Sequence, residues 1–129
     1  MNNEENPEHP WIGEYILDDD GNPVPERNVL TWGDWLATHS NHVALTEFSW
    51  GRVSTIFLGL DARFISFDLQ DPLIHKPVLW ETMVFGGPLD REQWQYTSKE
   101  EALEGHRRLV EECKEAEKHC ISRFSPSLN

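Results

Sequence analysis

Lys and Arg are scarce in this chain and absent from its first 26 positions. The 129 residues carry 23 Asp and Glu against 11 Lys and Arg, which gives a formal net charge of −12. Eight of the acids lie within residues 1–26. Phosphate binding needs clustered basic side chains, so direct binding of nucleic acid is not expected. The charge indicates a solvated acidic arm, or an acidic surface that meets a basic partner or mimics DNA.

Long apolar runs are also missing. No stretch is long and apolar enough to span a membrane, and the first residues lack the basic start and apolar core of a signal peptide. The only cysteines, Cys113 and Cys120, are seven residues apart on a predicted helix. That is about 10 Å along the axis at ~1.5 Å per residue, too far for a disulfide, which needs Cα atoms within ~7 Å. We therefore expect free thiols facing the core of a cytoplasmic protein.

Apolar residues are nevertheless plentiful enough for a folded core. They make up 38% of the chain and include six Trp and six Phe. A chain of this length builds one core without disulfides. The pattern predicts a flexible acidic leader at 1–10, a single domain at 11–121 and a tail at 122–129.

Alternating and β-branched residues predict several short strands, at 14–17, 43–50, 53–60, 78–85 and 93–96. A short helix is predicted at 31–39, where Trp32 and Trp35 have helical spacing and Thr31 is the candidate N-cap. The segment 62–76 is predicted to be a surface loop. Gly51 is expected to mark a turn or a bulge.

The clearest helix follows Tyr96. Thr97 or Ser98 can cap it, with Glu100 or Glu101 at the third helical position of a capping box. One apolar stripe repeats every three or four residues: Ala102, Leu103, His106, Leu109, Val110, Cys113, Ala116 and Cys120. The predicted fold class is α+β, with an antiparallel sheet of three to five strands. The long C-terminal helix packs on one face, and the Trp-containing helix covers an edge or corner.

The sequence does not favour a metal site or a cofactor. Asp18, Asp20 and Asn22 alternate as in a calcium loop, but Pro23 stands where that loop needs Gly. Histidines and cysteines do not occur at zinc-binding spacing, and there is no nucleotide fingerprint or nucleophile elbow.

Glu81 and His106 are the candidate residues for catalysis. Alternation places Glu81 on the same strand face as Met83, but the sequence does not say which face meets the helix. His106 lies on the apolar stripe, where a histidine is most often a hydrogen-bonded core residue. If Glu81 is buried, it needs a partner such as His106 or Arg52, and the first of these pairs could act as acid and base.

Other polar residues are candidates for binding a ligand. Arg52 and Ser54 share one strand face and together could hold a phosphate or carboxylate. Asp61 ends that strand, and Tyr96 ends the last one. The full set of candidate ligand-binding residues is Arg52, Ser54, Asp61, Glu81, Tyr96 and His106.

Three segments of the chain also support a resemblance to a known family. They are Arg52–Asp61 (RVSTIFLGLD), Trp80–Asp90 (WETMVFGGPLD) and Tyr96–His106 (YTSKEEALEGH), and a weaker match covers 15–35. The chain resembles a widespread family of small uncharacterised proteins of tailed bacteriophages and prophages. It differs from that family in its acidic leader, in a longer loop at Arg63–Lys76 and in an extended C-terminal helix. The resemblance implies a phage setting but brings no activity with it.

Two classes of function remain open. The first is a binding protein that acts in an infected cell. It could sequester a small anionic ligand, such as a nucleotide signal of host defence. Alternatively, its acidic surface could bind a host protein, as an inhibitor or a DNA mimic. The second is a small enzyme that uses Glu81 and His106. The missing catalytic constellation favours binding over catalysis. An uncovered edge strand beside an exposed Trp would favour a homodimer.

Overall fold

The computed structural model describes residues 11–64 and 76–124, with side chains described as far as residue 119. The predicted acidic leader, most of the predicted loop, the end of the tail and the side chain of Cys120 lie outside the described residues.

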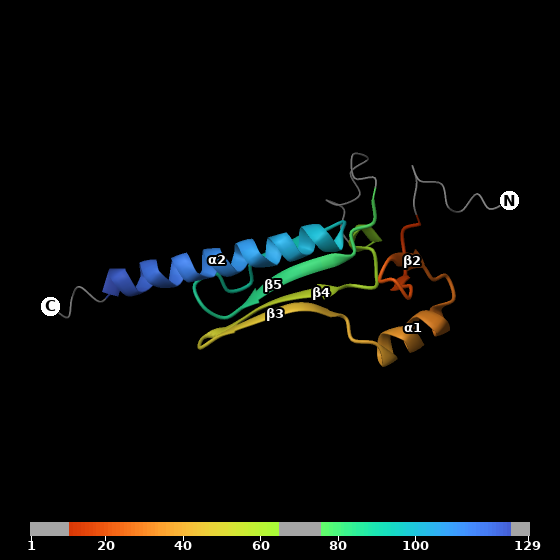
Figure 1. The fold of residues 1–129 in the computed structure, drawn as a ribbon, viewed down its shortest axis with the longest axis horizontal. Coiled ribbons are helices and arrows are strands. Elements are labelled where there is room, and N and C mark those ends of the chain that lie inside the picture. The colour runs from red at the N-terminus through yellow and green to blue at the C-terminus, as the bar shows by residue number, and fades with distance from the viewer. Residues whose placement is uncertain (1–10, 65–75, 125–129) are drawn as a thin grey trace.

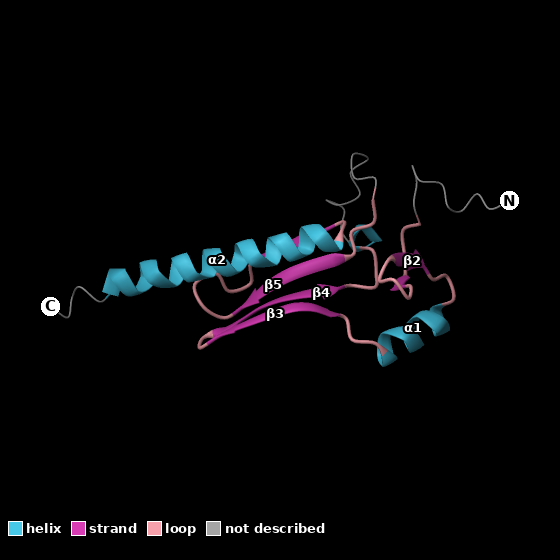
Figure 2. Cartoon of the chain, in the orientation of Figure 1, coloured by secondary structure: helices cyan, strands magenta, loops and turns pink. Residues whose placement is uncertain are grey.

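The fold is α+β, as predicted. Four strands form an antiparallel sheet whose spatial order follows the chain: β3 (His42–Phe48), β4 (Gly51–Phe57), β5 (Trp80–Phe85) and β6 (Gln93–Tyr96). The helix α2 (Lys99–Phe124) lies along one face of this sheet and continues past its end (Figure 1). Helix and sheet therefore form two layers, which the colouring of Figure 2 separates.

A smaller unit precedes the sheet. The strands β1 (Tyr15–Leu17) and β2 (Pro23–Pro25) form an antiparallel pair. The turn between them is held by Asp18, whose Oδ1 accepts hydrogen bonds from the backbone N–H groups of Asp20 and Asn22, both at 2.9 Å. The strand β2 was not predicted from the sequence, because two prolines in three residues disfavour a strand unless it lies at an edge.

The short helix starts earlier than predicted. It is α1 (Val29–Thr38), and Asn28 is its N-cap, with a side-chain oxygen that accepts from the N–H groups of Leu30 at 3.0 Å and Thr31 at 3.2 Å. The prediction that Thr31 is the cap was therefore wrong. Asn28 competes well for this position because its amide oxygen reaches the unpaired N–H groups of the first turn.

The long helix begins as predicted, with Ser98 as its cap. Its hydroxyl accepts from the N–H of Glu101 at 3.1 Å. The stripe facing the sheet is buried at Ala102, His106, Leu109, Val110 and Cys113. Leu103 departs from that pattern, since 44% of its surface is exposed beside the stripe.

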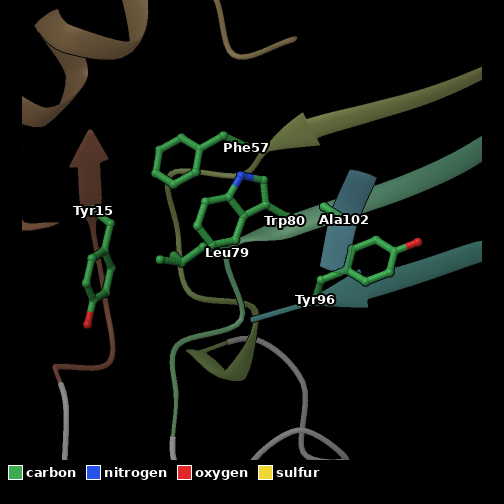
Figure 3. Packing of buried hydrophobic residues seen from close by; sticks show 6 residues of the cluster. All are labelled: Tyr15, Phe57, Leu79, Trp80, Tyr96 and Ala102. Atoms are coloured by element: carbon green, nitrogen blue, oxygen red, sulfur yellow. The ribbon is translucent and has the colours of Figure 1, made fainter. Parts of the chain in front are cut away.

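The core between helix and sheet consists of two apolar clusters. The first contains Tyr15, Phe57, Leu79, Trp80, Tyr96 and Ala102, shown in Figure 3. The second contains Val53, Val84, Leu109, Val110 and Cys113. Between them lie the buried polar side chains of Thr55, Thr82 and His106.

Burial along β4 and β5 settles which sheet face meets the helix. Val53, Thr55 and Phe57 are buried on β4, and Trp80, Thr82 and Val84 are buried on β5. The intervening residues of both strands point to the opposite face, which no described helix covers. We call this second side the open face.

Candidate functional site: a groove beside strand β6

Three of the six candidate residues lie on the open face. The carboxylate of Glu81 accepts hydrogen bonds from the side-chain amides of Gln93 at 2.8 Å and Gln95 at 2.9 Å. Arg52 places its guanidinium 4.5 Å from the centre of the Phe85 ring, an arrangement typical of a cation–π contact. Ser54 occupies the neighbouring position on the same side of β4.

Asp61 is buried in an ion pair. Its carboxylate accepts from the guanidinium of Arg63, with Nη2 at 2.7 Å and Nε at 3.0 Å from Oδ2. Its Oδ1 also accepts from the backbone N–H groups of Arg63 and Val78, each at 3.0 Å. Because these donors surround the carboxylate, Asp61 fixes the segment that leads into β5 and is not available to a ligand.

His106 belongs to a buried hydrogen-bonded network. Its Nδ1 lies 2.7 Å from Oγ1 of Thr55, which lies 2.5 Å from Oγ1 of Thr82, and its Nε2 lies 2.9 Å from Oγ1 of Thr46. A neutral imidazole has one donor and one acceptor nitrogen, and hydroxyl groups can serve both. Burial lowers the pKa of His106 from its ordinary value of 6.5, so the ring is neutral near neutral pH.

These positions correct the predicted acid–base pair. Glu81 points to the open face, while His106 lies beneath α2 on the other side of the sheet. The strand alternation that buries Thr82 turns Glu81 away from the helix. Glu81 and His106 therefore do not meet, and the predicted partner Arg52 contacts Phe85 in place of Glu81.

The six candidates thus do not form one ligand site. Arg52, Ser54 and Glu81 are separated by the sheet from His106 and Tyr96, and Asp61 is occupied by Arg63. A different set of residues encloses space. A groove of about 520 Å³ lies between β6 and α2, lined by Trp94, Gln95, Tyr96, Glu100, Glu101, Glu104 and Arg108.

The wall of this β6–α2 groove includes the edge of the strand itself. Trp94, Gln95 and Tyr96 are consecutive, and side chains of consecutive strand residues point to opposite faces. All three can line one groove only because it runs along the strand edge. Trp94 pairs with Thr82 in the register, which puts its side chain on the helix side, and 51% of its surface is exposed.

Tyr96 is the buried polar residue of the groove. Only 8% of it is exposed, and its hydroxyl has no hydrogen-bond partner in the part of the chain that the structure describes. The ring packs directly under α2, because a Cβ built on Gly105 would lie 2.1 Å from Oη. Leaving a buried hydroxyl unpaired costs about 1–3 kcal/mol, so this contact between β6 and α2 is not optimal for stability.

Acidic side chains dominate the helix wall of the groove. Glu100, Glu101 and Glu104 line it together with one cation, Arg108. Glu101 accepts a hydrogen bond from the Thr97 hydroxyl at 3.1 Å, and Glu104 pairs with the exposed Arg107. The groove therefore favours cations over anions.

The outer side of β6 has no strand partner among residues 11–64 and 76–124. The Val84 N–H donates a hydrogen bond to the Glu92 carbonyl at 2.9 Å. This bond determines which residues of β5 and β6 have backbone groups that point toward each other. In an antiparallel pair, alternate residues bond inward and outward, so the N–H and C=O groups of Gln93 and Gln95 point to the free edge. Such an edge is a template for another strand.

Of the groove residues, only Tyr96 was predicted from the sequence as a site residue. The others are Trp94, Gln95, Glu100, Glu101, Glu104 and Arg108. The strand sequence did contain an indication. Trp94 is flanked by the polar residues Gln93 and Gln95, which is typical of a strand at an exposed edge. On the helix, Glu100, Glu104 and Arg108 repeat every four residues, which places them on one side. The sequence does not show that this side of the helix lies next to β6.

Within the described part of the chain, no three His, Cys, Asp or Glu side chains gather as a metal ion would require. Among the described helices, none combines the length and apolarity needed to cross a membrane.

Comparison with known proteins adds no further guide. No family model, no curated protein and no solved structure matches the chain. The resemblance to phage proteins therefore stays a prediction, and the function must be argued from the groove.

Proposed function

We propose that this protein acts by binding, and that it captures an extended, basic segment of a partner protein in the β6–α2 groove. The observation that supports this most directly is the edge of β6, unpaired among the described residues, beside a groove lined by three carboxylates and an exposed Trp. In the phage setting that the resemblance implies, the partner would be a host protein.

The groove matches a lysine or arginine side chain in two ways. Glu100, Glu101 and Glu104 supply carboxylates that can accept charge-assisted hydrogen bonds. Trp94 supplies an exposed ring face, and a cation over such a face contributes about 0.5–2 kcal/mol. The formal charge of −12 adds longer-range attraction, which speeds association with a basic partner.

The free edge of β6 supplies the backbone part of the recognition. A segment that adds as a fifth strand would bond to the outward N–H and C=O groups of Gln93 and Gln95. Alternate side chains of that segment would then point toward α2, where the carboxylates lie. Backbone pairing gives affinity for any extended chain, and the acidic wall selects basic residues at every second position.

This proposal replaces the expectation of a small anionic ligand held by Trp side chains together with Arg52 and Tyr96. Those side chains lie on opposite sides of the sheet, and three carboxylates beside Tyr96 would repel an anion. Catalysis has no support from the placement of Glu81 and His106.

Fluorescence anisotropy with labelled nonapeptides tests the proposal. The probe alternates Lys and Thr, and a matched peptide alternates Glu and Thr. We expect saturable binding of the Lys peptide and none of the Glu peptide. A Glu100→Gln/Glu104→Gln variant should weaken binding by about two- to thirty-fold, since each of the two exposed ion pairs contributes ~0.2–1 kcal/mol.

The matched control is Glu111→Gln/Glu112→Gln, which removes the same charge from α2 outside the groove. If both double variants weaken binding equally, the attraction is only general electrostatics and the proposed site is wrong. Sedimentation of the free protein tests the alternative occupant, a second copy paired edge to edge at β6. A stable dimer that Trp94→Lys dissociates would replace the peptide as the occupant of this edge.

A further inference from the structure

The helix α2 runs antiparallel to β6 along the groove. Where β6 ends, Ala102 of the helix and Tyr96 belong to one packed cluster (Figure 3). About two turns later, Leu109 packs in a second cluster with Val84, whose N–H bonds to the Glu92 carbonyl just before β6 begins. The helix therefore starts beside the C-terminal end of β6 and then passes the beginning of that strand.

The charges on the helix wall of the groove are sorted along this direction. Glu100 and Glu101 lie in the first turn of α2, next to the end of β6. Arg108 lies about 12 Å further along the helix axis, at ~1.5 Å per residue from Glu100. Glu104 lies halfway between them. One end of the groove wall is therefore acidic and the other end is basic.

Arg108 is open to a partner. Its side chain is exposed, and within the described part of the chain it forms no ion pair. Glu104, one turn before it, pairs with Arg107. The side chains of Glu92 and Glu112 do not belong to the lining of the groove. The guanidinium of Arg108 can therefore bind a partner's carboxylate, through two parallel hydrogen bonds.

A strand added at the edge of β6 would meet these charges in a fixed order. Antiparallel pairing uses the outward N–H and C=O groups of Gln93 and Gln95, and it is slightly more stable per residue than parallel pairing. The added residue opposite Trp94 points toward α2, as do the residues two positions before and after it. These two outer residues lie about 14 Å apart at ~3.4 Å per residue, which is close to the ~12 Å between the acidic and basic ends of the wall.

We propose that the groove binds a segment with the order basic–x–basic–x–acidic, antiparallel to β6. This inference rests on the function proposed above and specifies its partner. The first basic side chain meets Glu100 and Glu101 at the start of α2. The second meets Glu104 and the ring of Trp94. The acidic side chain meets Arg108. A segment of the reverse order, bound in the same direction, brings like charges together at both ends.

Two heptapeptides of identical composition test this order. They are Thr-Lys-Thr-Lys-Thr-Glu-Thr and its reverse, Thr-Glu-Thr-Lys-Thr-Lys-Thr, both with blocked termini. Fluorescence anisotropy measures their affinities beside that of the Lys–Thr nonapeptide. We expect the first heptapeptide to bind about two- to thirty-fold more tightly than its reverse, because the reverse order loses two exposed ion pairs. The two peptides have the same net charge, so general electrostatics does not produce this difference.

Arg108→Gln should reduce the preference by about two- to five-fold, since it removes the partner of the peptide's Glu side chain. Lys114→Gln removes the same charge from α2 outside the groove and should leave the preference unchanged. Both positions are exposed, so both variants are expected to fold.

The outcomes separate this inference from the function on which it rests. The inference is overturned if the two heptapeptides bind equally or not at all while the Lys–Thr nonapeptide binds. Tighter binding of the reverse peptide would indicate parallel pairing and would also overturn it, as would a preference that Arg108→Gln leaves intact. If the nonapeptide does not bind either, the proposed function itself is wrong.

Discussion

Replacing Gly105 by Ala should destabilise the protein, although Ala is the better helix former. A Cβ at this position would lie 2.1 Å from Oη of Tyr96 and 2.4 Å from its Cε1 and Cζ. No real contact is that short, so the ring must move or α2 must lift from the sheet. Ala gains about 1 kcal/mol of helix propensity over Gly, whereas overpacking costs ~1–3 kcal/mol and also exposes part of Tyr96. We expect a net loss of about 1–2 kcal/mol.

Urea unfolding followed by Trp fluorescence measures this difference. Gly33→Ala is the matched control, because it lies inside α1 and a Cβ there would meet nothing within 4 Å. The control should stabilise the protein by up to ~1 kcal/mol. Tyr96→Phe should be neutral or stabilising, since it removes a buried hydroxyl that has no described partner.

The double variant Gly105→Ala/Tyr96→Phe tests the cause of the loss. It removes the shortest contact, at Oη, and leaves the contacts at 2.4 Å, so we expect partial recovery of stability. If Gly105→Ala alone is as stable as the wild type, Tyr96 does not pack under the helix as described. The base of the groove would then have a different shape.

Three further predictions concern the candidates that the fold explains structurally. Burial lowers the pKa of His106 in the folded protein, so as the pH falls the unfolded chain takes up this proton before the folded protein does. The stabilisation that comes from the neutral, buried ring is therefore present above about pH 6.5 and is lost as the pH falls below it. Urea midpoints between pH 7.5 and 5.5 should therefore fall in the wild type and fall less in His106→Gln, and equal slopes would contradict this. Asp61→Asn breaks the buried ion pair between Asp61 and Arg63 and should cost ~3–5 kcal/mol of unfolding free energy; a loss below 1 kcal/mol in urea would refute the buried pair. Glu81→Gln should change that free energy by less than about 0.5 kcal/mol in the same assay, whereas a large loss would place Glu81 in the core.

Local patterns were enough to predict much of the fold. The cap at Ser98 and the three- and four-residue spacing of the apolar stripe define α2, because capping and periodicity are properties of one segment. The strand β6 was predicted with its observed bounds, and β4 and β5 only approximately. Prediction failed at β2, where two prolines in three residues disfavour a strand, and at the cap of α1, where Asn28 caps the first turn in place of Thr31.

The site could not be predicted in the same way, because it depends on which sheet face the helix covers. The two faces of β5 are similar in apolar content, with Trp80 and Val84 on one side and Met83 and Phe85 on the other. Propensity alone cannot choose between them. Once α2 takes the first face, Glu81 and His106 are separated and the edge of β6 becomes a wall of the groove.

Amide hydrogen exchange along β6 tests most directly whether this edge captures a basic strand. The rates of the Gln93 and Gln95 N–H groups, which point outward, are compared with and without the alternating Lys–Thr peptide. The N–H of Trp94, which points toward β5, is the internal control. The account predicts that the peptide slows exchange at Gln93 and Gln95 and changes Trp94 much less, with the effect lost when alternate peptide nitrogens are methylated. Saturating peptide that leaves both outward amides exchanging at their free rates would contradict it.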